Sequence, residues 1–152
     1  MEEAPVVVDL NVLLASILKP LGYTSSHLIQ LYMKGRRLHI PAYTREEFER
    51  VAAEIARRKG LNPRTLTSRF NSILNLLKEV RVEEYREYIK EAEELVNDPK
   101  DAPYVALALH LAGKHGKAVI LTCNQEDYKT GELEGRNIIV ARPGDPRITV
   151  QK

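Results

Sequence analysis

The sequence has little of several residue types, and each shortage excludes a class of protein. One cysteine, Cys123, among 152 residues excludes an internal disulfide and a cysteine-based zinc site, and predicts a reducing, cytoplasmic environment. With 8 glycines and 8 prolines, the chain is neither collagen-like nor of low complexity. No apolar run approaches the ~20 residues of a membrane span, and the acidic start lacks the basic region of a signal peptide. We therefore expect no membrane partner and a single domain over residues 1–152, because 43% of the residues are hydrophobic.

The charges nearly balance but are unevenly distributed. A net charge of +2 argues against a simple polycation that coats nucleic acid. Residues 34–69 nevertheless contain ten Lys or Arg against four Glu, and residues 83–101 contain eight acids against three bases. Either run can be the solvated face of helices.

Short apolar runs alternate with segments of helical periodicity along the chain. Runs rich in β-branched residues predict buried parallel strands, and apolar residues spaced three or four apart predict helices. This alternation is typical of βαβ crossovers, so we expect an α/β fold in which helices flank a central parallel sheet of four or five strands in a three-layer sandwich. We expect strands at residues 5–9, 38–41, 80–82, 118–122 and 137–140, and helices at about 11–18, 25–34, 44–59, 64–79, 84–96 and 102–115.

Local signals mark several helix ends. Thr44 and Glu47 fit a capping box at the start of a helix. Asn62 and Asp98, each followed by proline, are typical N-cap residues. The helix at 102–115 is apolar nearly all round and should be the most buried. The tail after about residue 146 should be poorly ordered.

Acidic side chains follow most of the expected strands. In an open α/β sheet the functional crevice lies outside the carboxyl ends of the strands. The loops that reach this crevice should therefore bring their polar side chains together. The candidates are Asp9 and Asn11, Glu46 or Glu47, Asp98 and Asp101, and Thr122, Asn124, Glu126 and Asp127.

Such a cluster of like charges is unfavourable unless a cation lies within it. Hard oxygen ligands favour Mg²⁺ or Mn²⁺ over zinc. Either ion can orient a phosphodiester and lower the pKa of an attacking water, so that hydrolysis needs no Ser, Cys or His nucleophile. The residue types therefore indicate metal-dependent hydrolysis of phosphodiesters.

Four segments, in order, resemble the motifs of the PIN-domain family. Residues 6–14 (VVVDLNVLL) resemble its opening strand, and residues 41–51 (PAYTREEFERV) resemble its second motif. Residues 98–108 resemble the third motif, and residues 120–128 (ILTCNQEDY) resemble the fourth. Any one motif is weak, but four in the right order are fairly specific, and together they cover essentially the whole chain.

The resemblance implies a metal-dependent ribonuclease on a PIN-domain fold. The best-known members are VapC-type toxins of toxin–antitoxin pairs, usually homodimers, so it also implies an RNA substrate and an antitoxin partner. Carried over to this sequence, it implies Asp9, Glu47, Asp101 and Asp127 as catalytic acids, with Asp9, Asp101 and Asp127 holding Mg²⁺ or Mn²⁺ and with Asn11, Thr122, Asn124 and Asp98 in support.

Some assignments stay open. Glu46 competes with Glu47, whose capping box is an alternative role, and Glu126 competes with Asp127. Asp98 has an alternative role as an N-cap. The basic side chains could hold RNA phosphates near the crevice or simply be solvated. These side chains are Arg36, Arg37, Arg57, Arg58 and Lys59.

Two departures from the family pattern motivate a second hypothesis. Leu10 stands where a Thr or Ser is usual, and Asn124 stands where many members have Asp. A PIN fold with weak or no catalysis, serving as an RNA- or protein-binding module, is therefore the alternative to an endoribonuclease. A phosphatase or phosphoacceptor is less favoured, because Asn11 stands where a haloacid-dehalogenase-type enzyme has its second Asp.

Overall fold

The computed structural model describes residues 3–148 and contains a five-stranded parallel sheet. The strands lie in the order β3-β2-β1-β4-β5, so β1 is central. The side chains of β1, β2 and β4 are all buried, because helices cover both faces of a parallel sheet. The α/β fold predicted from the alternating pattern is confirmed. The strands are β1 (Val6–Val8), β2 (Leu38–Pro41), β3 (Lys78–Val80), β4 (Ala118–Leu121) and β5 (Ile138–Ala141).

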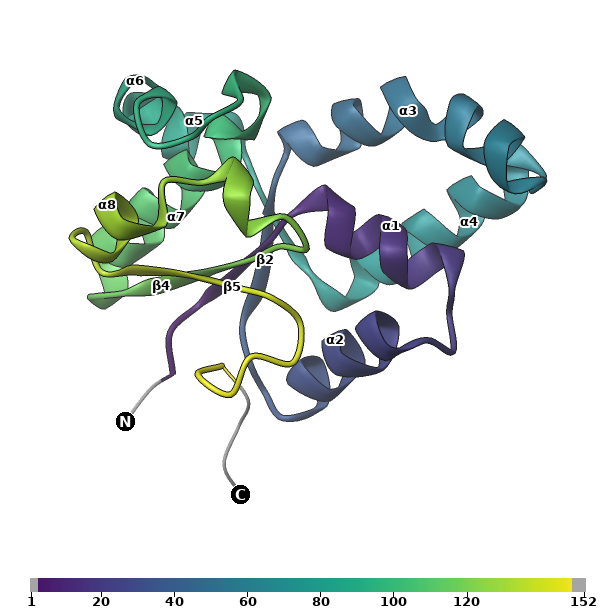
Figure 1. The fold of residues 1–152 in the computed structure, drawn as a ribbon, viewed down its shortest axis with the longest axis horizontal. Coiled ribbons are helices and arrows are strands. Elements are labelled where there is room, and N and C mark those ends of the chain that lie inside the picture. Colours follow the sequence, from purple (N-terminus) through teal and green to yellow (C-terminus); the bar gives the residue numbers. More distant parts are fainter. Residues whose placement is uncertain (1–2, 149–152) are drawn as a thin grey trace.

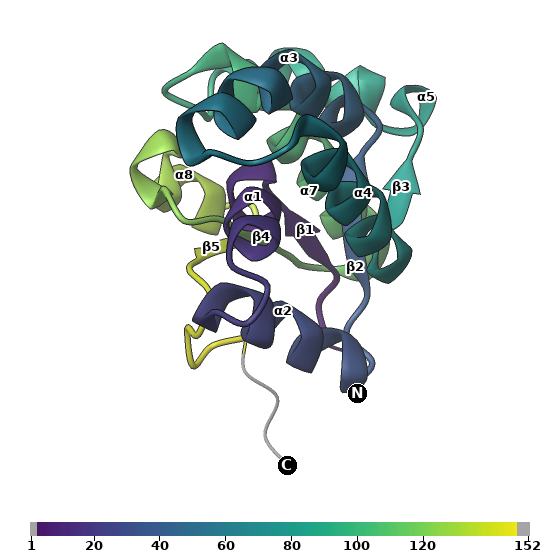
Figure 2. The ribbon, with the colours of Figure 1, turned by 90° about the vertical axis from the view of Figure 1, so that its right-hand side faces the viewer.

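Helices flank the sheet (Figure 1). In that view, α1 to α4 lie to the right of the central strands, and α5 to α8 lie to the left. The view turned by 90° shows α2 below α1 (Figure 2). The helices are α1 (Leu10–Leu18), α2 (Tyr23–Met33), α3 (Tyr43–Lys59), α4 (Pro63–Ile73), α5 (Val82–Tyr85), α6 (Ile89–Glu93), α7 (Ala102–His115) and α8 (Thr130–Glu134), with short 3-10 turns η1 (Leu74–Leu76), η2 (Arg86–Tyr88), η3 (Pro99–Asp101) and η4 (Gln125–Asp127).

The helix α7 forms the centre of the core, as its apolar sequence predicts. Six consecutive residues, Tyr104 to Leu109, are buried. The helix packs across β4, β1 and β2, so its amino end lies at the edge of the sheet where these strands finish. On the other side of the molecule, the rings of Phe48 and Phe70 stack 3.9 Å apart and join α3 to α4.

Element boundaries differ from the predictions in the region 64–96. The predicted helix 64–79 ends as an α-helix at Ile73, and β3 is Lys78–Val80 rather than residues 80–82. Lys78 and Glu79 are exposed on an edge strand that pairs only with β2, so they lack the apolar signature of a buried strand. The predicted helix 84–96 is divided into α5, η2 and α6, and the short helix α8 was not predicted.

Two of the three predicted N-caps are confirmed. The Asn62 side chain accepts a hydrogen bond from the Arg64 amide, and the Asp98 side chain accepts one from the Lys100 amide. The capping box is wrong, because α3 begins after Ala42 and has no side-chain cap. Thr44 instead donates to the hydroxyl of Tyr104 in α7, a tertiary contact invisible to local sequence rules.

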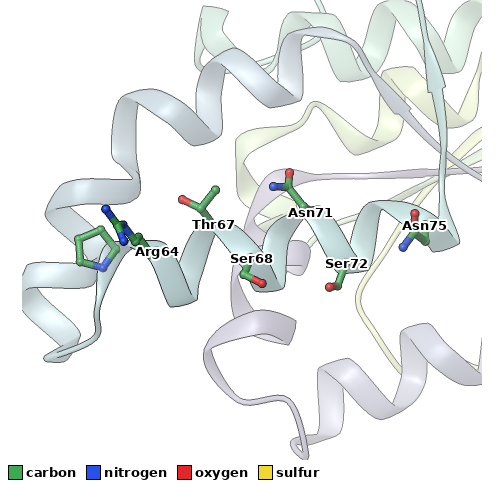
Figure 3. A pocket seen from close by; sticks show the side chains of 7 residues that line it. Arg64, Thr67, Ser68, Asn71, Ser72 and Asn75 are labelled. Carbon is green, nitrogen blue, oxygen red and sulfur yellow. The ribbon is translucent and has the colours of Figure 1, made fainter.

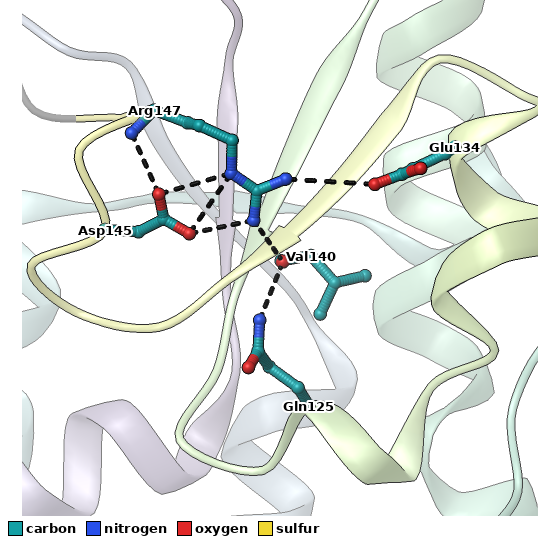
Figure 4. A network of polar contacts seen from close by, with 5 residues as sticks. All are labelled: Gln125, Glu134, Val140, Asp145 and Arg147. Carbon is teal, nitrogen blue, oxygen red and sulfur yellow. Dashed lines mark hydrogen bonds and ion pairs between the residues drawn. The ribbon is translucent and has the colours of Figure 1, made fainter.

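The chain after residue 146 is packed in its described part, which corrects the predicted disorder for Arg147 and Ile148; residues 149–152 lie outside the described residues. Arg147 pairs with Asp145 and donates to the Val140 carbonyl of β5, which also accepts from Gln125 (Figure 4). Ile148 is 1% exposed. The chain end is thereby tied to the loop that follows β4.

The prediction that Arg36 and Arg37 lie near the acidic crevice is wrong. Both precede β2 and therefore lie at the amino edge of the parallel sheet, opposite the crevice. The Arg36 guanidinium is buried and donates to the carbonyls of Ala4 and Ile148, at 2.9 and 2.7 Å, with Glu3 3.1 Å from its Nε. Its role is to join the two ends of the chain. Among residues 3–148, no helix is both long and apolar enough to cross a bilayer.

We predict that Arg36→Ala lowers the free energy of unfolding by about 1–3 kcal/mol, because two buried carbonyls lose their donor. Urea unfolding monitored by circular dichroism measures this change. The exposed Arg64→Ala is the matched control and should stay within about 0.5 kcal/mol of the parent chain. Equal stability of the two variants would contradict the structural role of Arg36.

Candidate functional site

The site forms where β1 and β4 part. The chain leaves β1 toward β2 on one side, and β4 lies on the other, so the loops after β1 and β4 diverge and leave a crevice between them. Asp9 follows β1 directly, and its amide donates to the carbonyl of Leu121 at the end of β4. Thr122 follows β4 and is fully buried. Strand order alone therefore places these two side chains together.

The Asp9 carboxylate is held by two hydroxyl groups. Tyr128 donates to Asp9 Oδ2 at 2.6 Å, and Thr122 donates to the same oxygen at 3.1 Å. Thr122 Oγ1 also accepts from Asn11 Nδ2 and from the Asn124 amide, and the Cys123 amide donates to Asn11 Oδ1. This network joins the loop after β1 to the loop after β4 and fixes the orientation of Asp9.

Glu47 is held in a similar way from α3. It is 8% exposed, and its Oε1 accepts a 2.7 Å hydrogen bond from the buried hydroxyl of Tyr104 in α7. The same hydroxyl accepts from Thr44. The three side chains therefore fix α3 against α7 and point a carboxylate at the crevice. Glu46, the competing acid, is exposed and does not line it.

Asp101 stands at the amino end of α7. It is 3% exposed, and its Oδ2 is buried without a hydrogen-bond partner. Asp98 shapes the turn before it, because Asp98 accepts from the Lys100 amide and its carbonyl accepts from the Asp101 amide. A buried carboxylate oxygen without a donor is costly, and a cation is the kind of partner that satisfies it.

Asp127 is brought to the crevice by contacts between two loops. The Asn97 amide donates to the Asp127 carbonyl at 2.9 Å, and Asn97 Nδ2 donates to the Glu126 carbonyl at 2.6 Å. Val96 and Tyr128 form an antiparallel bridge beside them. These contacts hold the loop after β4 against the loop before α7. Asp127 lines the crevice, whereas the competing Glu126 is exposed and does not.

The crevice is a pocket of about 440 Å³ that collects residues from four segments of the chain. It holds all four acids proposed from the motifs, together with Asn11 and Asn124. Three basic side chains, Arg50, Arg58 and Lys100, also line it. Arg57 and Lys59 do not line the pocket. Thr122 and Asp98 do not line it either, but Thr122 orients Asp9 and Asp98 shapes the turn before Asp101.

A second hollow contrasts with this pocket. It lies on the outer face of α4 and is lined by residues such as Thr67, Ser68 and Asn71 (Figure 3). Its lining contains no carboxylate, and Arg64 is its one charged side chain. It therefore lacks the ligands of a hard cation.

Burial and mutual repulsion raise the pKa values of the site acids. Burial raises the pKa of Asp101 to about 7, and the charge of Asp9 adds to this increase. Burial also raises the pKa of Asp9, against the opposing effect of the Tyr128 hydrogen bond. The pKa of Glu47 is raised by burial as well, although Tyr104 lowers it in part. A cation would favour the ionised forms of all three.

The residues fit a divalent cation that keeps part of its water shell. Within residues 3–148, no three His, Cys, Asp or Glu side chains are arranged to enclose a metal ion directly. Mg²⁺ commonly binds through one or two carboxylates and retains several waters. The unpartnered Asp101 Oδ2 and the neighbouring charge of Asp9 are consistent with this mode.

Sequence reasoning missed five residues of the site. Tyr104 and Tyr128 lie in motifs but look like core aromatics, and only their hydroxyl contacts show that they orient Glu47 and Asp9. Thr44 was assigned to a helix cap. Arg50 and Lys100 face the pocket from α3 and η3. Their proximity to the acids depends on how α3 and α7 pack, which no local pattern encodes.

We predict that Asp101 makes the metal-free chain progressively less stable, relative to the Asp101→Asn variant, as the pH rises from about 4 to 7. The folded state raises the pKa of Asp101 to about 7, so it binds more protons than the unfolded chain in this range. Asp101→Asn should remove this penalty and stabilise the chain at pH 8 by of the order of 2 kcal/mol. Urea unfolding in EDTA at pH 5 and pH 8 measures the difference.

Asp98→Asn is the matched control for this experiment. The Lys100 amide lowers the pKa of Asp98, so this carboxylate stays ionised from pH 5 to pH 8 and its loss should leave the pH dependence unchanged. An equal pH dependence of stability in the parent chain and in Asp101→Asn would contradict the burial of like charges.

Comparisons with known proteins agree with this geometry. The family profile described as PIN domain matches residues 7–114, which include Asp9, Glu47 and Asp101. The fold resembles two solved structures, each at 16% sequence identity. The first is VapBC2 from Rickettsia felis bound to a promoter DNA fragment, with a TM-score of 0.61 over 90% of this chain and 97% of that chain. The second is DNA-bound VapBC from Salmonella typhimurium, with a TM-score of 0.59 over 92% of this chain and 98% of that chain. A search of curated proteins gave no significant match. With the profile spanning more than two thirds of the sequence and the sheet and acids arranged as described, the chain belongs to the PIN domain family.

Proposed function

We propose that this chain is a Mg²⁺- or Mn²⁺-dependent endoribonuclease of the VapC toxin type. The observation that carries the proposal is the pocket itself, where Asp9, Glu47, Asp101 and Asp127 meet from four separate segments. A structural role for the acids does not explain why Asp101 Oδ2 is buried without a partner. A nuclease that neutralises its acids with a cation does explain it.

Asp9, Asp101 and Asp127 would hold the ion, in part through water. When bound, it supplies a water of lowered pKa and orients the phosphodiester. Tyr128 and Thr122 keep the Asp9 carboxylate in place, so little reorganisation is needed on binding. Glu47, held by Tyr104, accepts a hydrogen bond from the attacking water and places it in line with the scissile bond. Hydrolysis then leaves a 5′-phosphate on the product.

The basic residues on the rim would hold the RNA backbone. Arg50 and Arg58 lie two turns apart on α3 and line the pocket together with Lys100. Phosphate contacts of this kind give affinity without sequence choice. Arg57 and Lys59 extend the basic end of α3 beyond the pocket and would contact flanking phosphates.

The proposal of a VapC-type toxin includes an antitoxin partner, a homodimeric state and a cytoplasmic location. It is supported by the order of the four motifs and by the likeness of the fold to VapBC complexes. A PIN fold that binds RNA or protein without cleaving it is the alternative. The buried Leu10 favours that alternative, because it places an apolar side chain on the pocket wall.

We predict that the parent chain cleaves single-stranded RNA with Mg²⁺ or Mn²⁺ and not with EDTA. Asp9→Asn and Asp101→Asn should each lower the cleavage rate at least ~100-fold, because loss of a metal ligand removes both the ion and the activated water. Gel analysis of labelled RNA gives the rate and shows whether the products carry 5′-phosphates.

Two pairs of neighbouring acids provide matched controls. Glu47→Gln and Asp127→Asn should impair cleavage strongly, whereas Glu46→Gln and Glu126→Gln, which alter exposed side chains outside the pocket, should not. Cleavage that persists in EDTA or in Asp9→Asn would remove the mechanism. RNA binding with no cleavage and no Mn²⁺ binding would favour the binding module.

We also predict that Arg50→Ala and Arg58→Ala weaken RNA binding with little change in metal affinity. Each should reduce the slope of log affinity against log salt by about 1, because each removes one phosphate contact. Fluorescence anisotropy at several salt concentrations, in Ca²⁺ to prevent cleavage, measures the slope. Arg57→Ala, one residue away and outside the pocket, is the control and should have the smaller effect on affinity.

A further inference from the structure

A further polar pocket, distinct from the hollow on α4, lies at the edge of the sheet opposite the acids. Its walls come from the end of α2, the start of β2, β3 with the η1 turn before it, one residue of α5, and the last turns of α7, and it shares no lining residue with the acidic pocket. The amino ends of all five parallel strands share this edge, so the pocket cannot be part of the acidic site. Its volume is about 470 Å³, within the range of about 300–1,000 Å³ that small-molecule sites occupy.

The charged side chains that line this pocket are mostly basic, whereas those of the acidic pocket are mostly acidic. Arg37, Lys78 and Lys114 line it, and Glu84 is the one acid among the lining residues. Lys78 and Lys114 form no ion pair within residues 3–148. Arg36 also lines the pocket, but its guanidinium is engaged by backbone carbonyls. Arg37 is engaged as well, because it donates to the Glu3 carbonyl. Lys78 and Lys114 still outnumber Glu84 among the lining residues, so the cavity is positive.

A buried imidazole lies among the lining residues. Lys78 is the strand neighbour of His39, which is 7% exposed and lines the pocket. Burial lowers the pKa of His39, and the charges of Lys78 and Arg37 add to this effect. Arg37 Nη1 also lies 3.4 Å from His115 Nδ1. A ligand that carries negative charge at this point would relieve their repulsion.

The rest of the lining suits a flat heterocycle. Tyr32 is half-exposed and lines the pocket, and the exposed imidazole of His115 adds a second ring. Rings of this kind stack on nucleobases, while Lys and Arg bind phosphate through charge-assisted hydrogen bonds. The pocket thus combines phosphate-binding cations with stacking surfaces in a volume that holds one nucleotide.

We propose that this pocket binds a phosphate monoester of nucleotide size, such as a 5′-mononucleotide. The site is separate from the acidic pocket and does not rest on ribonuclease activity. The ligand could be a free nucleotide or the 5′-phosphorylated end of an RNA chain, which present the same chemistry. The experiment below separates these sources.

The test is calorimetric titration of the full chain in EDTA, so that no metal draws phosphate to the acidic pocket. The probes are AMP, inorganic phosphate and an eight-nucleotide RNA with or without a 5′-phosphate. We expect saturable 1:1 binding of AMP that is tighter than that of inorganic phosphate, with a shift of the His39 imidazole signals in NMR spectra. Preference for the 5′-phosphorylated RNA over AMP would identify the RNA end as the source.

The double variant Lys78→Ala/Lys114→Ala should weaken AMP binding at least tenfold. The control Lys19→Ala/Lys90→Ala removes the same charge from exposed positions outside the pocket and should stay within twofold. Lys78→Arg should retain binding, which separates charge from folding. The proposal is overturned by the absence of saturable AMP binding, by equal losses in both double variants, or by equal affinity for AMP and inorganic phosphate.

Discussion

The rest of the site depends on one constraint: Asp9 and Asp101 are buried close together with the same charge. Folding places both on one pocket, because Asp9 follows the central strand and Asp101 directly precedes the most buried helix. The surrounding hydroxyls of Tyr128, Thr122 and Tyr104 stabilise the neighbouring carboxylates, but Asp101 Oδ2 has no donor. The fold thus stores an electrostatic cost at the point where a cation would release it.

The parallel sheet separates the molecule into two chemically different edges. The acids line the pocket at the carboxyl edge, whereas the pocket at the amino edge is lined by Arg36, Arg37, Lys78 and Lys114. The near-zero net charge of the whole chain conceals both edges. The role of an arginine depends on the edge at which it lies. Arg36 donates to backbone carbonyls at the amino edge, whereas Arg58 lines the acidic pocket at the carboxyl edge.

Much of the fold followed from the sequence, because its strongest signals are local. The apolar strands at β1 and β4 and the all-round apolar helix α7 produce patterns that only a covered parallel sheet satisfies. Signals failed where a residue's partner is distant. Lys78 and Glu79 form an edge strand because they pair with the backbone of β2. Thr44 does not cap a helix, because its hydroxyl donates to Tyr104 instead.

For the site, the sequence by itself determined which residue types would end each strand and so which acids could meet. It favoured Glu47 and Asp127 through the family resemblance but left Glu46 and Glu126 as rivals, because adjacent carboxylates have the same chemistry. The tertiary structure decided between them by placing Glu47 and Asp127 on the pocket, and it assigned Tyr104 and Tyr128 to orienting the acids. The physical reason is that local propensity acts over a few residues, whereas the direction of a side chain depends on how distant helices pack against the sheet.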